Sequence, residues 1–161
     1  YGAAGRSFTV VALQDDSGAD VNLLLFCCWM GRNGRQLGRQ ALRSAIRAAA
    51  SWQSEVVRPL RGARRALKQE HRGADREFCE SLRKRIGAAE LDAEYAEQRI
   101  LARCAAELPL RVSRCEPRTA VETNLERYLD LLGAPPGRRE ARHLATLIDA
   151  CFPRPSSAPG R

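Results

Sequence analysis

The longest apolar stretch of the chain without a charged residue runs from Leu23 to Met30, and no turn residue interrupts it. A segment that is apolar on every side has no face for water, so we expect protein to surround it. It is too short to cross a bilayer, which takes about 20 residues as a helix. Asp20 before it and Gly31 after it are typical of a helix start and a helix stop. The pattern predicts a short buried helix over residues 20–31, at the centre of the fold.

Apolar positions that recur every three or four residues predict helices along much of the remaining chain. One amphipathic helix begins near Arg39 and carries Leu42, Ala45, Ile46 and Ala49. Ser51 can cap a new helix from Trp52, in which Pro59 removes one amide donor and should kink or restart the helix. A mildly apolar segment over residues 7–16 fits either a short helix or a strand.

The longest helical pattern covers residues 74–108. Its expected inner positions are Phe78, Leu82, Ile86, Ala89, Ala93, Ala96, Ile100 and Cys104. Leu91, Tyr95 and Leu101 extend the apolar surface to a second face. At about 1.5 Å per residue such a helix is about 50 Å long. That length favours an antiparallel hairpin, in which residues 52–72 lie back along part of it.

The C-terminal third predicts two more helices. Thr119 with Glu122 three residues later is a capping-box pattern, and a helix over residues 137–151 turns Leu144, Leu147, Ile148 and Cys151 inward. Residues 153–161 have nothing to bury and should be disordered. We therefore expect an all-α protein of about six helices, with one domain over residues 1–152 and an N-terminus trimmed before Tyr1.

The net charge of +8 permits an acidic partner, but the charge is uneven along the chain. Residues 32–72 hold eleven basic and two acidic side chains, whereas residues 73–108 hold six basic and eight acidic ones. Two basic rows follow the helical repeat: Arg32, Arg35, Arg39, Arg43 and Arg47, and Arg58, Arg61, Arg65, Lys68 and Arg72. Such a row can neutralise phosphates. It can equally pair with the glutamates of the long helix, and the arginine excess can also reflect coding bias.

The alternative of a nucleic-acid-binding accessory protein rests on the second of these rows. Phosphate binding predicts that its five residues share one exposed face and that affinity falls steeply with salt. No aromatic side chain is interleaved for base stacking, and no known nucleic-acid-reading motif is present. Pairing of the same arginines with glutamates between Glu80 and Glu97 would remove the face that this alternative needs.

Catalysis has little support in the sequence. The six cysteines form no C-x-x-C pair and the chain has two histidines, so no metal site, cofactor or catalytic residue is predicted. A cysteine enzyme would use Cys27 or Cys28, and would need a partly exposed thiol beside a cation or a histidine. Reduced thiols together with the lack of a signal peptide or membrane span favour a cytoplasmic protein.

Binding of another protein is the first functional hypothesis. Trp29 and Trp52 are large, each has an indole N–H that needs a partner when buried, and both are expected in the core. A tryptophan left at an open groove between helices would instead mark a site for a partner. The hypothesis is a non-catalytic interaction module that acts through the hairpin or beside Trp29, with an unknown protein partner and an unknown oligomeric state.

Two motifs carry a family resemblance. The first is Asp20-Val21-Asn22-Leu23-Leu24-Leu25-Phe26-Cys27 followed by Trp29, and the second is Trp52 with Glu55-Val56-Val57-Arg58-Pro59-Leu60-Arg61. Weaker matches follow as far as residue 133. With these motifs the chain resembles a family of small bacterial proteins of unknown function. The resemblance implies an all-helical cytoplasmic protein and supplies no activity.

Overall fold

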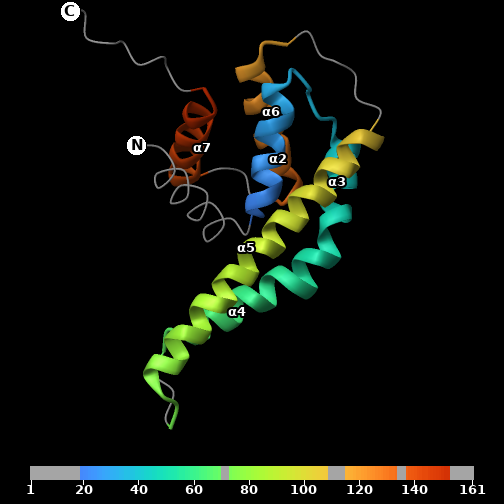
Figure 1. Ribbon diagram of the computed structural model, residues 1–161. Coiled ribbons are helices and arrows are strands. Elements are labelled where there is room, and N and C mark those ends of the chain that lie inside the picture. The colour runs from blue at the N-terminus through green and yellow to red at the C-terminus, as the bar shows by residue number, and fades with distance from the viewer. Residues whose placement is uncertain (1–18, 70–72, 109–114, 134–136, 153–161) are drawn as a thin grey trace, which may run out of the picture. The chain divides into compact units, whose positions relative to one another are not determined.

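A computed structural model describes residues 19–69, 73–108, 115–133 and 137–152. The regular elements of these ranges are helices, which confirms the all-α prediction, and one of them is 32 residues long (Figure 1). The predicted element at 7–16 and the predicted disordered tail at 153–161 lie outside the described residues. The sequence predicted one domain over residues 1–152, and the contacts of the chain gather in two compact units.

The first unit comprises residues 1–43 and 109–161, and we call it the α2 unit. Its centre is α2, Val21–Arg32, whose start is capped as expected because the Asp20 carboxylate accepts a 2.8 Å hydrogen bond from the Asn22 N–H. α2 lies side by side with α6, Pro117–Leu131, and these two helices make its most extensive helix–helix contact (Figure 1). The core that they share includes Leu23, Leu24, Phe26, Met30, Val121, Leu125 and Leu129.

Gly31 of α2 lies directly against the backbone of Val121 in α6. A Cβ atom at Gly31 would stand 2.5 Å from the backbone nitrogen of Val121, well inside van der Waals contact. Backbone has little room to move in a close-packed interior, so only glycine fits there. The residue predicted as a helix stop therefore serves a different purpose, because α2 continues through it to Arg32.

The prediction that α2 is enclosed on every side is wrong for two residues. Leu25 is 38% exposed and Trp29 is 48% exposed, whereas the neighbouring apolar side chains of α2 are buried. Residues four apart lie on one face of a helix. α2 therefore has a buried side toward α6 and an exposed stripe that begins at Leu25, continues through Trp29 and ends at the exposed Arg32.

A buried amide fixes the segment after α2. The Asn124 side chain, fully buried on α6, accepts a 2.7 Å hydrogen bond from the Leu37 N–H. Its amide nitrogen donates to the carbonyl oxygens of Cys27 at 3.2 Å and Arg35 at 3.0 Å. Arg127 adds a 2.8 Å bond to the Leu37 carbonyl oxygen. One side chain thus bonds with three backbone groups, and the bonds to the Leu37 N–H and the Cys27 carbonyl oxygen are buried.

The last helix of the α2 unit is α7, Arg138–Cys151, close to the predicted 137–151. Arg118 of α6 donates a 2.6 Å hydrogen bond to Asp149 of α7. The start of α6 corrects the sequence analysis: Glu116 caps it by accepting from the Thr119 N–H at 3.0 Å, and Pro117 is its first residue. Proline suits that position because the first helical N–H has no intrahelical partner, so the predicted capping box at Thr119 is not used.

The second unit comprises residues 44–108, and we call it the hairpin unit. α3, Arg39–Trp52, ends in this unit and runs without a break into the π-helical segment η1, Gln53–Val57, and then into α4, Arg58–Ala66. The predicted new start at Ser51 is therefore wrong. The predicted restart at Pro59 does not occur either, because the backbone stays helical through Val57 and Arg58; the helix instead changes from π to α just before Pro59, which lies in the first turn of α4.

α5, Arg76–Glu107, forms the other arm of the hairpin and packs against α4 and η1 (Figure 1). Asp75 caps it by accepting a 2.9 Å hydrogen bond from the Phe78 N–H. The predicted inner positions hold only in part, because Ala93 is buried while Phe78 and Ala89 are exposed. The buried line instead consists of Glu90, Ala93, Glu97, Leu101 and Ala105. Two glutamates, Glu90 and Glu97, are therefore buried in the hairpin unit, where the sequence pattern predicted only apolar side chains.

Candidate functional site

The hairpin unit contains a cluster of charged side chains that is largely shielded from water. Arg61 of α4 donates from Nε to Glu90 Oε1 at 2.9 Å and from Nη2 to Glu94 Oε1 at 2.5 Å. Arg64, one turn further along, donates to both carboxylate oxygens of Glu90. The Glu90 and Arg61 side chains are only 6% and 11% exposed. We call these four residues the Arg–Glu cluster.

Electrostatics within this cluster favour the charged forms. Burial raises the pKa of Glu90, but the hydrogen bonds and positive charges of Arg64 and Arg61 outweigh it, and the net pKa lies below its usual 4.5. Burial lowers the pKa of Arg61, and the hydrogen bonds and charges of Glu90 and Glu94 more than reverse this. At neutral pH Glu90, Arg61 and Arg64 are therefore charged, and each faces a side chain of opposite sign.

Trp52 lies on the same side of the hairpin. Its indole N–H donates a 2.9 Å hydrogen bond to the carbonyl oxygen of Ala93, and its ring is partly buried. Together with the buried Gln53 and Val57 of η1, it joins this arm of the hairpin to α5. This agrees with the expected packing role, in which the polar end of the indole finds a partner.

The five residues of the second basic row do not share one available face. Arg61 is engaged with two glutamates, while Arg58, Arg65 and Lys68 are exposed on α4 or just after it. Arg72 lies outside the described residues. Arg64, which the sequence analysis did not place in the row, is the second arginine of the cluster. Pairing with Glu90 and Glu94 thus removes Arg61 from the exposed basic face that nucleic-acid binding would need.

Cys27 and Cys28 do not have the surroundings of a nucleophile. Both side chains are buried on α2. Burial raises the pKa of Cys27, and a hydrogen bond with Cys151 together with burial raises the pKa of Cys28. A thiol attacks as its thiolate, and these two thiols stay protonated and out of reach of a substrate. The alternative of a cysteine enzyme that uses them does not fit the structure.

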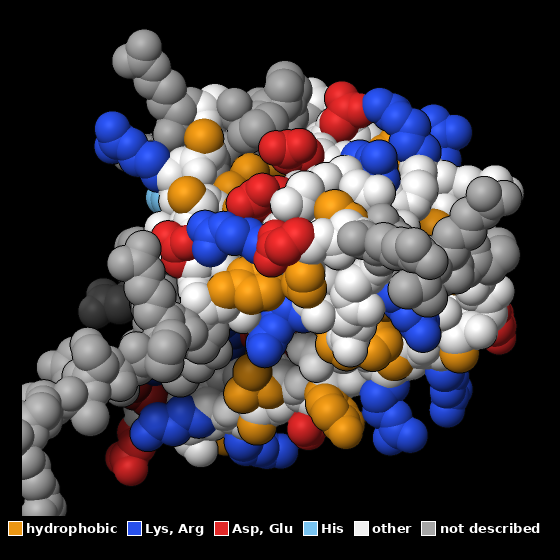
Figure 2. All heavy atoms as spheres, turned by 90° about the horizontal axis from the view of Figure 1, so that it is seen from above, with side chains coloured by type: hydrophobic (Ala, Val, Ile, Leu, Met, Phe, Trp, Pro, Cys, Tyr) orange, Lys and Arg blue, Asp and Glu red, His pale blue; other side chains and the backbone are white. Residues whose placement is uncertain are grey.

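The exposed stripe of α2 is a different kind of surface. Trp29 and Leu25 present apolar area to solvent, and the Trp29 ring lies 6.1 Å from the Phe26 ring, centroid to centroid. The predicted burial of Trp29 is therefore wrong, because Phe26 and Met30 supply the inward-facing side chains of that turn. The space-filling view shows hydrophobic side chains among lysines and arginines on the face in view (Figure 2).

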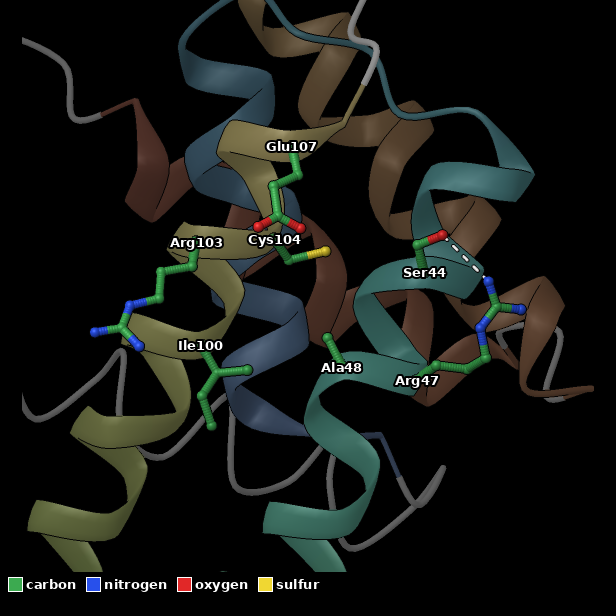
Figure 3. Close-up of a pocket in the computed structure, with 7 residues that line it drawn as sticks. All are labelled: Ser44, Arg47, Ala48, Ile100, Arg103, Cys104 and Glu107. Carbon is green, nitrogen blue, oxygen red and sulfur yellow. Dashed lines mark hydrogen bonds between the residues drawn. The ribbon is translucent and has the colours of Figure 1, made fainter.

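A groove of about 520 Å³ lies in the hairpin unit between α3 and α5. It is lined by Ser44, Arg47, Ala48, Ile100, Arg103, Cys104 and Glu107. Cys104, Ala48 and Glu107 reach toward its centre, while the Arg103 side chain points away from it (Figure 3). Burial and the charge of Glu107 raise the pKa of Cys104. The groove therefore presents a neutral thiol and the Glu107 side chain from α5, and from α3 Ser44 and Arg47, which are joined by a 3.2 Å hydrogen bond.

The described residues contain neither a metal-binding cluster nor a membrane-spanning helix. No three His, Cys, Asp or Glu side chains gather there in a way that could hold a metal ion. Among the same residues, no helix combines the length and the apolar character needed to cross a membrane.

Sequence reasoning missed the residues that organise both units. Asn124 lies among Val121, Leu125 and Tyr128 on the buried face of α6, and a polar residue inside an apolar stripe is the signal that could have found it. Glu90 and Glu97 stand three and four residues from Ala93, which was expected to face inward. That spacing puts them on the same face as Ala93. Because glutamate is so rarely buried, both were expected on the surface.

The fold and these surfaces define a helical protein built on a charged hairpin, with an apolar stripe exposed on a separate helix. The sequence profile of the family described as "Protein of unknown function (DUF2390)" matches residues 1–101, and the chain belongs to this family. This confirms the resemblance to a family of unknown function. No curated protein and no solved structure matches the chain.

Proposed function

We propose that this protein is a non-catalytic protein-interaction module that binds its partner through the exposed stripe of α2. The site consists of Leu25 and Trp29, and the partner is a protein segment with a complementary apolar stripe, such as an amphipathic helix. We place the protein in the cytoplasm in this proposal, because no disulfide bond joins the cysteines of the described residues.

The observation that carries the proposal is the exposure of Trp29 on a helix whose other aromatic residue is buried. Tryptophan is enriched among the residues that dominate binding energy at protein interfaces, because it combines a large apolar area with few rotamers. Its exposed fraction of 48% leaves much of that area open to a partner. Leu25, one turn earlier, extends the same stripe.

The proposal is tested by co-purification of the full chain from its host, with nuclease present and salt varied. The expected partner stays bound as salt rises, because apolar contacts are not screened. It is lost with Leu25→Ser and with Trp29→Ser. Phe78→Ser is the matched control, because Phe78 is an exposed aromatic residue of α5 that lies outside the stripe. Equal recovery with Trp29→Ser and with the unsubstituted chain would contradict the proposal.

A second candidate, the nucleic-acid-binding accessory protein, keeps Arg58, Arg65 and Lys68 as its exposed residues. If they contact phosphates, Arg58→Gln with Lys68→Gln should reduce the slope of log affinity against log salt by about 2. Arg76→Gln, which removes an exposed charge at the start of α5, is the control and should leave the slope unchanged. An unchanged slope for the α4 double variant would argue against this candidate.

A further inference from the structure

α5 carries an apolar surface that its partner helix does not cover. Leu91 is 67% exposed and Tyr95 is 63% exposed, and both are among the most exposed large apolar side chains of the described residues. They stand four residues apart, on one face of the helix. Ala88 and Ala102 are also exposed and share this face. The contacts with α4 and η1 lie at Ala93 and Glu90 on the far side of the helix and at Glu94, which borders this face.

The spacing along this surface is that of a coiled-coil seam. Ala88, Tyr95 and Ala102 are seven residues apart, and Leu91 and Gln98 alternate with them. In heptad terms the first three occupy a positions and the other two occupy d positions. The seam therefore covers about two heptads in the middle of a 32-residue helix, where the backbone is firmly helical.

The charges beside the seam match a second copy that runs in the opposite direction. Asp92 and Arg99 both occupy e positions, one heptad apart, and both are exposed. Two antiparallel helices bring each e position beside an e position of the other. When Tyr95 of one copy faces Gln98 of the other, Asp92 lies beside Arg99 of the other copy, and the two-fold axis forms the same ion pair a second time.

The same charges disfavour the other pairings. An antiparallel register that places Leu91 opposite Tyr95 would set Asp92 against Asp92 of the other copy, and like charges repel. A parallel pair would place Glu94 beside Arg99, but the Glu94 carboxylate already accepts a hydrogen bond from Arg61 within its own chain. The charge pattern thus selects one register and one direction.

We propose that the Ala88–Ala102 face of α5 binds the same face of a second copy of this chain, as an antiparallel helix pair closed by two Asp92–Arg99 ion pairs. The seam belongs to a different helix from the stripe of α2 and acts independently of it. An interface of this size is small, so the dimer is weak and dissociates on dilution.

The first test is sedimentation equilibrium of the full chain over a dilution series. We expect a reversible monomer–dimer equilibrium that Leu91→Glu and Tyr95→Glu each abolish, because each would bury a charge without a partner. Phe78→Glu, an equally exposed residue of the same helix that lies off the seam, should leave the equilibrium unchanged. A chain that is monomeric throughout the series, or a dimer that Tyr95→Glu does not affect, overturns the proposal.

The second test exchanges the charges. Asp92→Arg and Arg99→Asp should each weaken the dimer about tenfold, because each replaces two attractive pairs by two repulsive ones. The double variant should recover the original affinity to within about threefold, since the two pairs are then restored in reverse. An equimolar mixture of the two single variants should form a heterodimer tighter than either homodimer. A dimer that neither exchange affects overturns the antiparallel register. Helix circular dichroism of every variant shows that it is folded.

Discussion

The two units hold their central helices together by different chemistry. In the α2 unit, apolar side chains and one buried amide join α2 to α6, and Gly31 allows the two backbones to approach closely. In the hairpin unit, α4 has no fully buried residue and is joined to α5 by the Arg–Glu cluster. Apolar packing depends on shape and volume, whereas a shielded ion-pair cluster depends on pH and on every member being present.

The two units also fix the arrangement of their helices in different ways. Apolar side chains tolerate exchanges of similar volume, so the α2 unit needs Asn124 to fix the path of the segment that follows α2. In the hairpin, Glu90 can accept from both arginines in only one register of α4 against α5. A slipped register would leave a shielded charge without a partner, which costs several kcal/mol. Five substitutions and one pH series test this contrast.

The largest expected effect is that of Leu24→Ala in the α2 unit. Leu24 is fully buried, so truncation should cost about 2–5 kcal/mol of unfolding free energy. Leu25→Ala, next in the chain but 38% exposed, is the control and should cost less than about 1 kcal/mol. Urea denaturation measures both values. Amide exchange should show lost protection in α2 and α6, and equal losses for the two variants would mean that α2 has no buried side.

Asn124→Ala should cost about 3 kcal/mol. It removes the side-chain partner of the Leu37 N–H and the Cys27 carbonyl oxygen in a buried place, and that of the partly buried Arg35 carbonyl oxygen. Glu126→Ala on the exposed side of the same helix is the control. Amide exchange at Leu37 is the specific measurement, because this N–H bonds to the Asn124 side chain and not to a helix carbonyl. Unchanged protection there would contradict the assigned role.

Glu90→Gln should destabilise the hairpin unit by about 2 kcal/mol at neutral pH, since it leaves Arg61 and Arg64 without the full charge that they face. Glu80→Gln is the control, because Glu80 pairs with Arg83 on the same helix but is 53% exposed. Chemical denaturation followed through the fluorescence of Trp52 and Trp29 compares the two variants. Equal costs would show that the shielding of the cluster has no energetic effect.

The energetic cost of Glu90→Gln should depend on pH. The pKa of Glu90 is lowered in the folded state, so its stabilising contribution is complete above the unfolded value near 4.5 and is lost as pH falls through the folded pKa. The difference in unfolding free energy between the unsubstituted chain and Glu90→Gln should therefore shrink in acid. The cost of Leu24→Ala should change little over the same range, since no titrating group is removed. A cost of Glu90→Gln that is independent of pH would contradict the lowered pKa.

The smallest effects are expected at the helix caps. Asp20→Ala removes the cap of α2 and Asp75→Ala removes that of α5, and each should cost about 1 kcal/mol. The cost at Asp20 should be the larger, because its capping bond with the Asn22 N–H is partly buried, whereas the bond between Asp75 and the Phe78 N–H is exposed to water. Asn substitutions, which keep a capping oxygen, are the controls. Thermal unfolding ranks the four variants, and the opposite order of costs would contradict this reasoning.

The sequence predicted the helical class, the span of α2 and the long helix because these depend on local periodicity and capping residues. The cap at Asp20 was found in the same way. The Arg–Glu cluster was weighed only as a possible neutralisation of a surface row. Its burial depends on which faces of α4 and α5 meet. The periodicity of apolar residues cannot predict these faces when the residues in contact are charged.

The candidate surfaces were harder to predict than the elements. Trp29 lies in an unbroken apolar run, so periodicity cannot tell which of its residues face α6 and which face solvent. Phe78, Leu91 and Tyr95 show the converse problem, because an alanine-rich helix offers several apolar faces and only the partner helix decides which is covered. The exposed sides of both helices therefore needed the tertiary structure.

The π-helical segment η1 controls which way the residues beyond it point. In an uninterrupted α-helix of 3.6 residues per turn, Trp52 and Arg61 would stand two and a half turns apart and face opposite directions. The wider turns of Gln53–Val57 delay the rotation, so both side chains reach α5. A residue inserted into this segment, or deleted from it, would act as a change of phase: it would leave Trp52 in place and swing Arg61 and Arg64 out into water.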